Sequence, residues 1–142
     1  MKPQERNYSC GPAAIRAAFH VMGRSVTEKA LRAHAGTTNE GTDHNDILRA
    51  LRHYSQRGKE YETKFHSHAW KWLRRRISAG RPVILCVDRW DHWVTVVGNV
   101  GSKILLFDPN SKSKYSGLRP YSQDSLLSRW NYKNTFYGIA IY

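Results

Sequence analysis

The chain has 142 residues, 40% of them hydrophobic, and its 23 lysines and arginines outnumber its 11 acidic residues, giving a formal net charge of +12. This length favours a single domain over residues 1–142 and argues against two. The basic residues are spread along the chain and no helix-turn-helix, zinc-finger or RNP pattern is present. We therefore expect a basic face that attracts an acidic peptide or protein partner rather than nucleic acid.

Targeting and redox features favour a soluble cytoplasmic protein. No apolar run approaches the roughly 20 residues that cross a bilayer, and the start at Met1 lacks the apolar core of a signal peptide. The two cysteines, Cys10 and Cys86, are too few for a disulfide framework. His66 and His68 have no third ligand at metal spacing, so neither a metal nor another cofactor is expected. The pattern indicates no oligomeric state.

Three helices are predicted in the first third of the chain. Residues 13–22 are mostly apolar and stop at Gly23, and Pro12 suits the first turn, which places Cys10 at or just before the N-terminal end. A helix N-terminus favours a thiolate. Residues 25–28 have the form of a capping box for a short second helix that stops at Gly36. Thr42 or Asp43 caps a third helix, whose apolar stripe is Ile47, Leu48, Leu51 and Tyr54.

The remaining two thirds predict a sheet with two more helices. Alternation over residues 61–65 suggests a short strand or extended crossover, and Ser67 would cap a helix that stops at Gly80. Residues 83–87 are apolar on both faces and predict a buried central strand, followed by strands over 92–97 and 103–108. After a polar loop over residues 108–117 come a short helix capped by Ser122 and a final strand over 137–142. The expected class is α+β, with N-terminal helices packed on a C-terminal antiparallel sheet.

His92 and Asp108 are brought together by hairpin geometry alone. If the turn between their strands centres between Val100 and Gly101, His92 lies opposite Pro109 and next to or diagonal to Asp108. Cross-strand neighbours on one face come within about 5 Å of each other. A carboxylate at the end of one strand can therefore hold an imidazole at the start of the other, although a register shift of one residue changes the face.

Gln4 and Cys10 form the most specific motif of the sequence. A side-chain amide six residues before a thiol can reach back over a tight turn as an oxyanion donor. The spacing Gln-x5-Cys-Gly, followed by Gly80 to Val83, His92 to Val94 and Asp108-Pro109, resembles the papain-like cysteine peptidases, in particular the C39 and C39-like group. The resemblance implies a papain-like fold in which Cys10 attacks, His92 exchanges the proton, Asp108 orients the imidazole and Gln4 binds the oxyanion. It further implies a peptide substrate and, within this group, leader-peptide processing.

Other positions near this motif are candidates for substrate binding, namely Asp91, Trp93 and Thr42. For Thr42 helix capping is the simpler interpretation, and for Asp91 a solvated turn is equally consistent. Ser9 departs from the group, since many members have Asp before the Cys. Two alternatives stay open: a peptidase-like module that binds a peptide or anionic partner without cutting it, and an acyltransferase or amidase that uses the same site.

Overall fold

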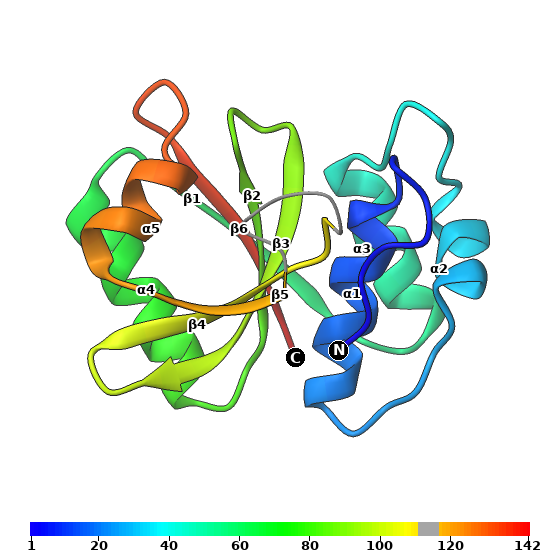
Figure 1. The fold of residues 1–142 in the computed structure, drawn as a ribbon, viewed down its shortest axis with the longest axis horizontal. Helices are drawn as coiled ribbons and strands as arrows, with labels where there is room; N and C mark the ends of the chain where they lie inside the picture. Colours follow the sequence, from blue (N-terminus) through cyan, green and yellow to red (C-terminus); the bar gives the residue numbers. More distant parts are fainter. Residues whose placement is uncertain (111–116) are drawn as a thin grey trace.

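A six-stranded antiparallel sheet separates two groups of helices in the computed structural model, which describes residues 1–110 and 117–142 (Figure 1). The strands follow the spatial order β1-β6-β2-β3-β4-β5. This arrangement confirms the predicted α+β class. The strands are β1 (Gly58–Thr63), β2 (Val83–Val87), β3 (His92–Val100), β4 (Lys103–Asp108), β5 (Gly117–Tyr121) and β6 (Phe136–Ile141), and the helices are α1 (Cys10–Val21), α2 (Glu28–Ala35), α3 (His44–His53), α4 (His66–Ser78) and α5 (Gln123–Trp130).

The central strand β2 has a core on each face. Ile84 and Cys86 pack with α1, α2 and α3, whereas Val83, Leu85 and Val87 pack with α4 and α5. All five residues are buried, as the uninterrupted apolar run predicted. The two cores place α1, which begins at Cys10, against the same sheet that carries β3 and β4.

The helix ends agree with the sequence in part. Asp43 caps α3 in a complete capping box with Asp46, as one of the two predicted options had it. The predicted capping box at residues 25–28 is wrong, because Thr27 itself caps α2 and Glu28 turns inward, where it is fully buried. The Ser67 cap is also wrong, since α4 begins at His66 with Phe65 at its N-cap, two residues before the predicted cap.

The register of β3 and β4 differs from the predicted one. The turn consists of Gly101 and Ser102, so Val100 pairs with Lys103. A bulge at Val97 then shifts the register of β3 against β4 by one residue. Beyond the bulge Val96 pairs with Leu106 and Thr95 with Phe107. Continuation of this register sets Asp108 opposite Val94, and His92 is then its diagonal neighbour on the same face.

Strand β5 was not predicted. The polar loop predicted over residues 108–117 lies mostly outside the described residues, and β5 follows it along the outer edge of β4. Pro120 is tolerated there because β5 is an edge strand of the sheet. Within the described residues no helix combines the length and apolar character that a membrane crossing requires.

Candidate active site

Cys10 is the first residue of α1 and lies partly exposed at the point where the helix meets the sheet. The apolar run behind it is buried from Gly11 to Ile15 and holds the helix in place. A Cβ on Gly11 would approach the Thr42 side chain to 2.7 Å, so only glycine allows this close contact. The Cys-Gly pair thus combines a thiol at a helix N-terminus with a backbone that the 37–43 loop can approach.

His92 and Asp108 form a direct hydrogen bond across the β3–β4 ladder. His92 Nε2 lies 2.7 Å from Asp108 Oδ1, and the backbone N–H of Asn110 donates to the same oxygen at 2.9 Å. The Asp108 side chain has no exposure and that of His92 is 12% exposed. An ionised carboxylate only accepts, so Nε2 donates its proton and Nδ1 is left for the Cys10 thiol.

The charge state of this pair follows from its contacts. Burial opposes the imidazolium, but hydrogen bonds to Asp108 and to Cys10, together with their negative charges, raise the pKa of His92 to about 9. Burial likewise opposes the Asp108 carboxylate, and hydrogen bonds from His92, Asn110 and Arg129 nevertheless lower its pKa. These contacts therefore favour an imidazolium at His92 beside an ionised Asp108.

Arg129 was missed by the sequence analysis. It lies in the last turn of α5, and its Nη2 donates to Asp108 Oδ2 at 2.6 Å. The same guanidinium binds both carboxylate oxygens of Asp88 at 2.9 Å, and these contacts raise its pKa against the opposing effect of burial. A basic residue in the last turn of a helix is usually explained by the helix dipole. The local sequence therefore did not indicate that Arg129 binds Asp88 and Asp108.

Gln4 is fixed by backbone contacts on the N-terminal segment. Its N–H donates to the carbonyl of Pro109 at 2.8 Å, which links the segment to the end of β4. Its side-chain Nε2 donates to the Arg6 carbonyl at 2.7 Å and keeps a second hydrogen for another acceptor. Ser9 closes the same turn, because its hydroxyl accepts from the Arg6 N–H and donates to the Arg6 carbonyl, both at 3.0 Å.

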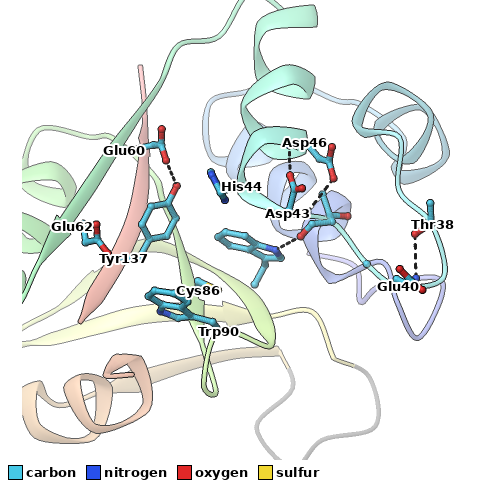
Figure 2. Close-up of a pocket in the computed structure, with 13 residues that line it drawn as sticks. Thr38, Glu40, Asp43, His44, Asp46, Glu60, Glu62, Cys86, Trp90 and Tyr137 are labelled. Carbon is cyan, nitrogen blue, oxygen red and sulfur yellow. Dashed lines mark hydrogen bonds between the residues drawn. The ribbon is translucent and has the colours of Figure 1, made fainter. Parts of the chain in front are cut away.

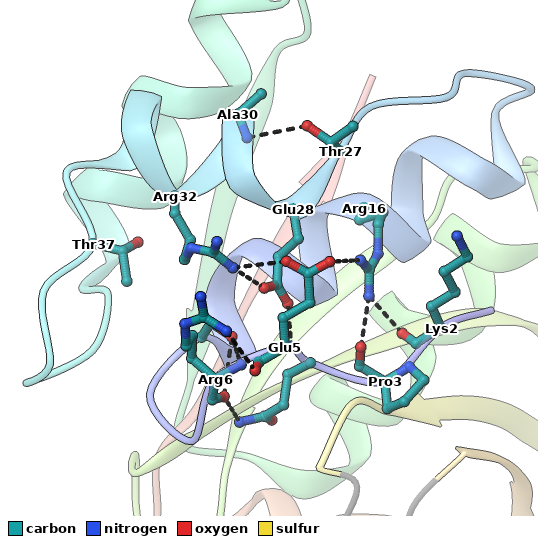
Figure 3. Close-up of polar contacts among 12 residues, drawn as sticks. Lys2, Pro3, Glu5, Arg6, Arg16, Thr27, Glu28, Ala30, Arg32 and Thr37 are labelled. Carbon is teal, nitrogen blue, oxygen red and sulfur yellow. Dashed lines mark hydrogen bonds and ion pairs between the residues drawn. The ribbon is translucent and has the colours of Figure 1, made fainter.

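Two arginines and a buried glutamate tie this segment to α1 and α2 (Figure 3). Arg16 donates to the carbonyls of Lys2 and Pro3 at 2.7 and 2.8 Å. Glu28 accepts from the Glu5 N–H at 3.0 Å and pairs with Arg32. We call this segment, residues 2–9, the N-terminal strap, since these contacts determine where Gln4 lies.

Two adjoining cavities lie on this side of the molecule, and Cys10 lines one of them. One, of about 630 Å³, is lined by Gln4, Cys10, His92 and the predicted Asp91. The other, of about 600 Å³, lies between the 38–43 loop and β1 and β6, and its wall includes Trp90, Trp93, Tyr137 and Thr42 (Figure 2). They share Glu40 and Gly41, so they adjoin each other. The indole of Trp93 donates to the Thr42 carbonyl at 2.7 Å and forms a fixed wall.

The cavities are negatively charged although the chain is strongly basic. The larger share of the carboxylates lies here: eight of the 11 acidic residues line one cavity or the other. In the described residues no group of three histidine, cysteine or acidic side chains is arranged to hold a metal ion. The eight acidic residues are Glu5, Glu40, Asp43, Asp46, Glu60, Glu62, Asp88 and Asp91.

Comparisons with known proteins agree with this geometry. The family model described as Peptidase C39 like matches residues 1–136, whereas no curated protein matches the sequence. The peptidase domain of Streptococcus ComA, a bifunctional ABC transporter of a quorum-sensing pathway, superposes with a TM-score of 0.73 at 21% identity, over 99% of this chain and 94% of that one.

Two further solved structures have the same fold. A double-glycine-motif protease from an AMS/PCAT transporter, in complex with the leader peptide, superposes with a TM-score of 0.74 at 18% identity, over 98% of this chain and 88% of that one. The N-terminal peptidase C39-like domain of the toxin secretion ATP-binding protein from Vibrio parahaemolyticus has a TM-score of 0.63 at 12% identity, over 99% of this chain and 97% of that one. The predicted papain-like C39 fold is thereby confirmed.

Proposed function

The chain belongs to the C39-like peptidase family, and from its site we propose that it cleaves peptide bonds with Cys10, His92 and Asp108 as a catalytic triad and Gln4 as the oxyanion donor. The observation that carries this proposal is the buried hydrogen bond of 2.7 Å between His92 and Asp108. The same imidazole shares a cavity with Cys10, the first residue of α1, and the influence of Cys10 helps to raise the pKa of His92.

In the proposed mechanism each of the four residues has one chemical role. The Cys10 thiolate attacks the scissile carbonyl, and the oxyanion is stabilised by the free hydrogen of Gln4 Nε2 and by the N–H of Cys10, which has no partner within a helix at this position. His92 gives its proton to the leaving amine, and Asp108 stabilises the charged ring beforehand. Water, deprotonated by the neutral His92, then releases the acyl group and restores the thiol.

The substrate we propose is a peptide segment that lies across the two cavities, as in leader-peptide processing. The net charge predicted an acidic partner, but the carboxylates around the cleft do not favour acidic side chains next to Cys10. We therefore place any acidic stretch of the partner on the basic surface outside the cavities. Two free cysteines are consistent with the cytoplasmic location that we propose.

The test is cleavage of a peptide library with matched cysteine variants. Cys10→Ser should lower kcat at least about 1,000-fold, whereas Cys86→Ser, which changes the other free cysteine at the wall of the second cavity, should leave kcat within about threefold. Peptide binding by Cys10→Ala without any cleavage by the wild type would instead support the binding module. Transfer of the acyl group to an added amine in place of water would support the acyltransferase.

A further inference from the structure

Among the described residues, Arg129 contacts three side chains that come from three different parts of the fold. Its Nη2 donates to Asp108 Oδ2, its Nε and Nη2 donate to the two oxygens of Asp88, and its Nη1 donates to the Tyr121 hydroxyl at 3.0 Å. The side chain is 13% exposed. A planar guanidinium can hold two carboxylates at once in fixed directions, whereas the ammonium of a lysine cannot.

The contact to Asp108 fixes the rotation of the carboxylate. Oδ1 already accepts from His92 and from the Asn110 N–H, and Oδ2 accepts from Arg129. Because the Asp108 side chain is fully buried, loss of Arg129 would leave Oδ2 without a donor and without water. The carboxylate would then turn or take up a proton, and His92 would lose its fixed orientation.

The contact to Asp88 fixes the turn that precedes His92. Asp88, Arg89 and Trp90 all have positive φ, at 54°, 61° and 62°. Residues other than glycine rarely adopt this left-handed backbone conformation. The Asp88 N–H donates to the Arg129 carbonyl at 3.1 Å, so this pair is bonded through both backbone and side chain. The same turn carries Trp90, which lines the cavity of about 600 Å³ between the 38–43 loop and β6.

We propose that Arg129 is a positioning residue with two separable effects. Through Asp108 it orients His92 for proton transfer, and through Asp88 it fixes the turn that places Trp90 in the wall of the 600 Å³ cavity. The proposal rests on the proposed peptidase function. It predicts that the two contacts influence different kinetic constants, because orientation of the base acts on the chemical step and the cavity wall acts on peptide binding.

The experiment compares four variants on one cleavable peptide. Arg129→Met should lower kcat roughly 10- to 100-fold and raise KM, since a slightly misplaced base is costly. Asp88→Asn should raise KM about threefold or more with kcat within about twofold. Arg129→Lys, which can reach one carboxylate at a time, should be intermediate in kcat. Tyr121→Phe removes the hydrogen bond from Nη1 but keeps both carboxylate contacts, and it should leave both constants within about twofold.

A spectroscopic measurement distinguishes positioning from a merely structural role. The His92 Nε2–H proton, which is hydrogen-bonded to Asp108, should give a far-downfield NMR resonance in the wild type and in Asp88→Asn. It should move upfield or broaden in Arg129→Met and Arg129→Lys. An unchanged resonance in a folded Arg129 variant, or kcat within twofold of the wild type, would overturn the proposal. If Arg129→Met does not fold, Arg129→Lys decides on the same two readouts.

Failure of this inference is distinguishable from failure of the peptidase function. Should Cys10→Ser retain full cleavage, the proposed function is wrong, yet the His92 resonance of the Arg129 variants still tests the contact through Asp108. Should Cys10→Ser be inactive while Arg129→Met keeps kcat and the resonance, the inference alone is wrong.

Discussion

The sheet and the N-terminal strap supply the two halves of the proposed site, and they are fixed in different ways. His92 and Asp108 are side chains on β3 and β4 that are held by buried charges, with Asp108 unexposed and Arg129 13% exposed. Gln4 belongs to a segment without regular structure and is held by backbone hydrogen bonds to Pro109 and Arg6. One of the strap's ion-pairing residues, Glu5, is 47% exposed.

This difference predicts unequal tolerance to change. A buried charge that loses its partner costs several kcal/mol, whereas an exposed pair contributes about 0–1 kcal/mol. The half with His92 should therefore respond to substitution in both activity and stability. The strap should respond mainly in activity, and in proportion to how far Gln4 is displaced.

The largest effect is expected for Asp108→Ala. The substitution removes the acceptor of His92 and leaves Arg129 beside a buried gap, so kcat/KM should fall roughly 1,000-fold. The free energy of unfolding, measured in urea, should fall by about 3 kcal/mol. A matched change at the exposed Asp124, Asp124→Ala, should cost less than about 1 kcal/mol and leave kcat/KM unchanged. Equal stability of the two variants would contradict the buried-charge account.

Gln4→Ala should affect activity without a comparable loss of stability. Removal of one oxyanion donor lowers kcat about 100-fold. The backbone bond to Pro109 does not depend on the side chain, so the midpoint of thermal unfolding should fall by no more than about 4 °C. Gln4→Glu offers a control that keeps the length of the side chain but places an anion where a donor is needed. If Gln4→Ala retains full kcat, the oxyanion role is excluded.

The pKa of His92 determines how the free energy of unfolding and kcat depend on pH. Because this pKa is raised from 6.5 to about 9 in the folded protein, protonation of His92 stabilises the fold. The contribution is complete below pH 6.5 and is lost as the pH rises through about 9. The difference in free energy of unfolding between the wild type and His92→Gln should follow this course, and kcat should fall above about pH 9 as the leaving group loses its proton donor. A difference that is already lost at pH 7 would contradict it.

A smaller effect is expected for Glu28→Ala, which releases the strap from α2. The variant loses the acceptor of the Glu5 N–H and a partner of Arg32, so the free energy of unfolding should fall by about 2 kcal/mol and kcat about threefold. Thr27→Ala is the matched control, because it weakens the cap of the same helix by about 1 kcal/mol without touching the strap. An equal fall in kcat for both variants would show that α2, not the strap, is responsible.

The sequence predicted those features that local chemistry determines. The helix opening at Cys10, the Asp43 cap and the two-faced core strand β2 follow from residues within a few positions of one another. The pairing of His92 with Asp108 was also anticipated, although for a register that the bulge at Val97 alters. In the observed register Asp108 lies opposite Val94, and this shift of one residue places His92 and Asp108 on the same face of the sheet.

The features that escaped prediction depend on distant segments. Strand β5 contains Pro120 and exists because β4 offers it an edge. Glu28 resembles part of a helix cap but is turned inward by Arg32 and the strap. Arg129 comes close to Asp88 and Asp108 only after α5 has packed beside β2, a juxtaposition that no local pattern records.

The most direct test of the central claim is mass spectrometry of Cys10 after rapid acid quenching of the enzyme with a cleavable peptide. The wild type and His92→Ala should both be digested and analysed, since slower hydrolysis in the variant favours accumulation of the intermediate. An acyl-enzyme on Cys10 should increase the mass of the peptide that contains this residue by the mass of the N-terminal product less one water. Product release without an adduct, together with undiminished cleavage by Cys10→Ser, would contradict it.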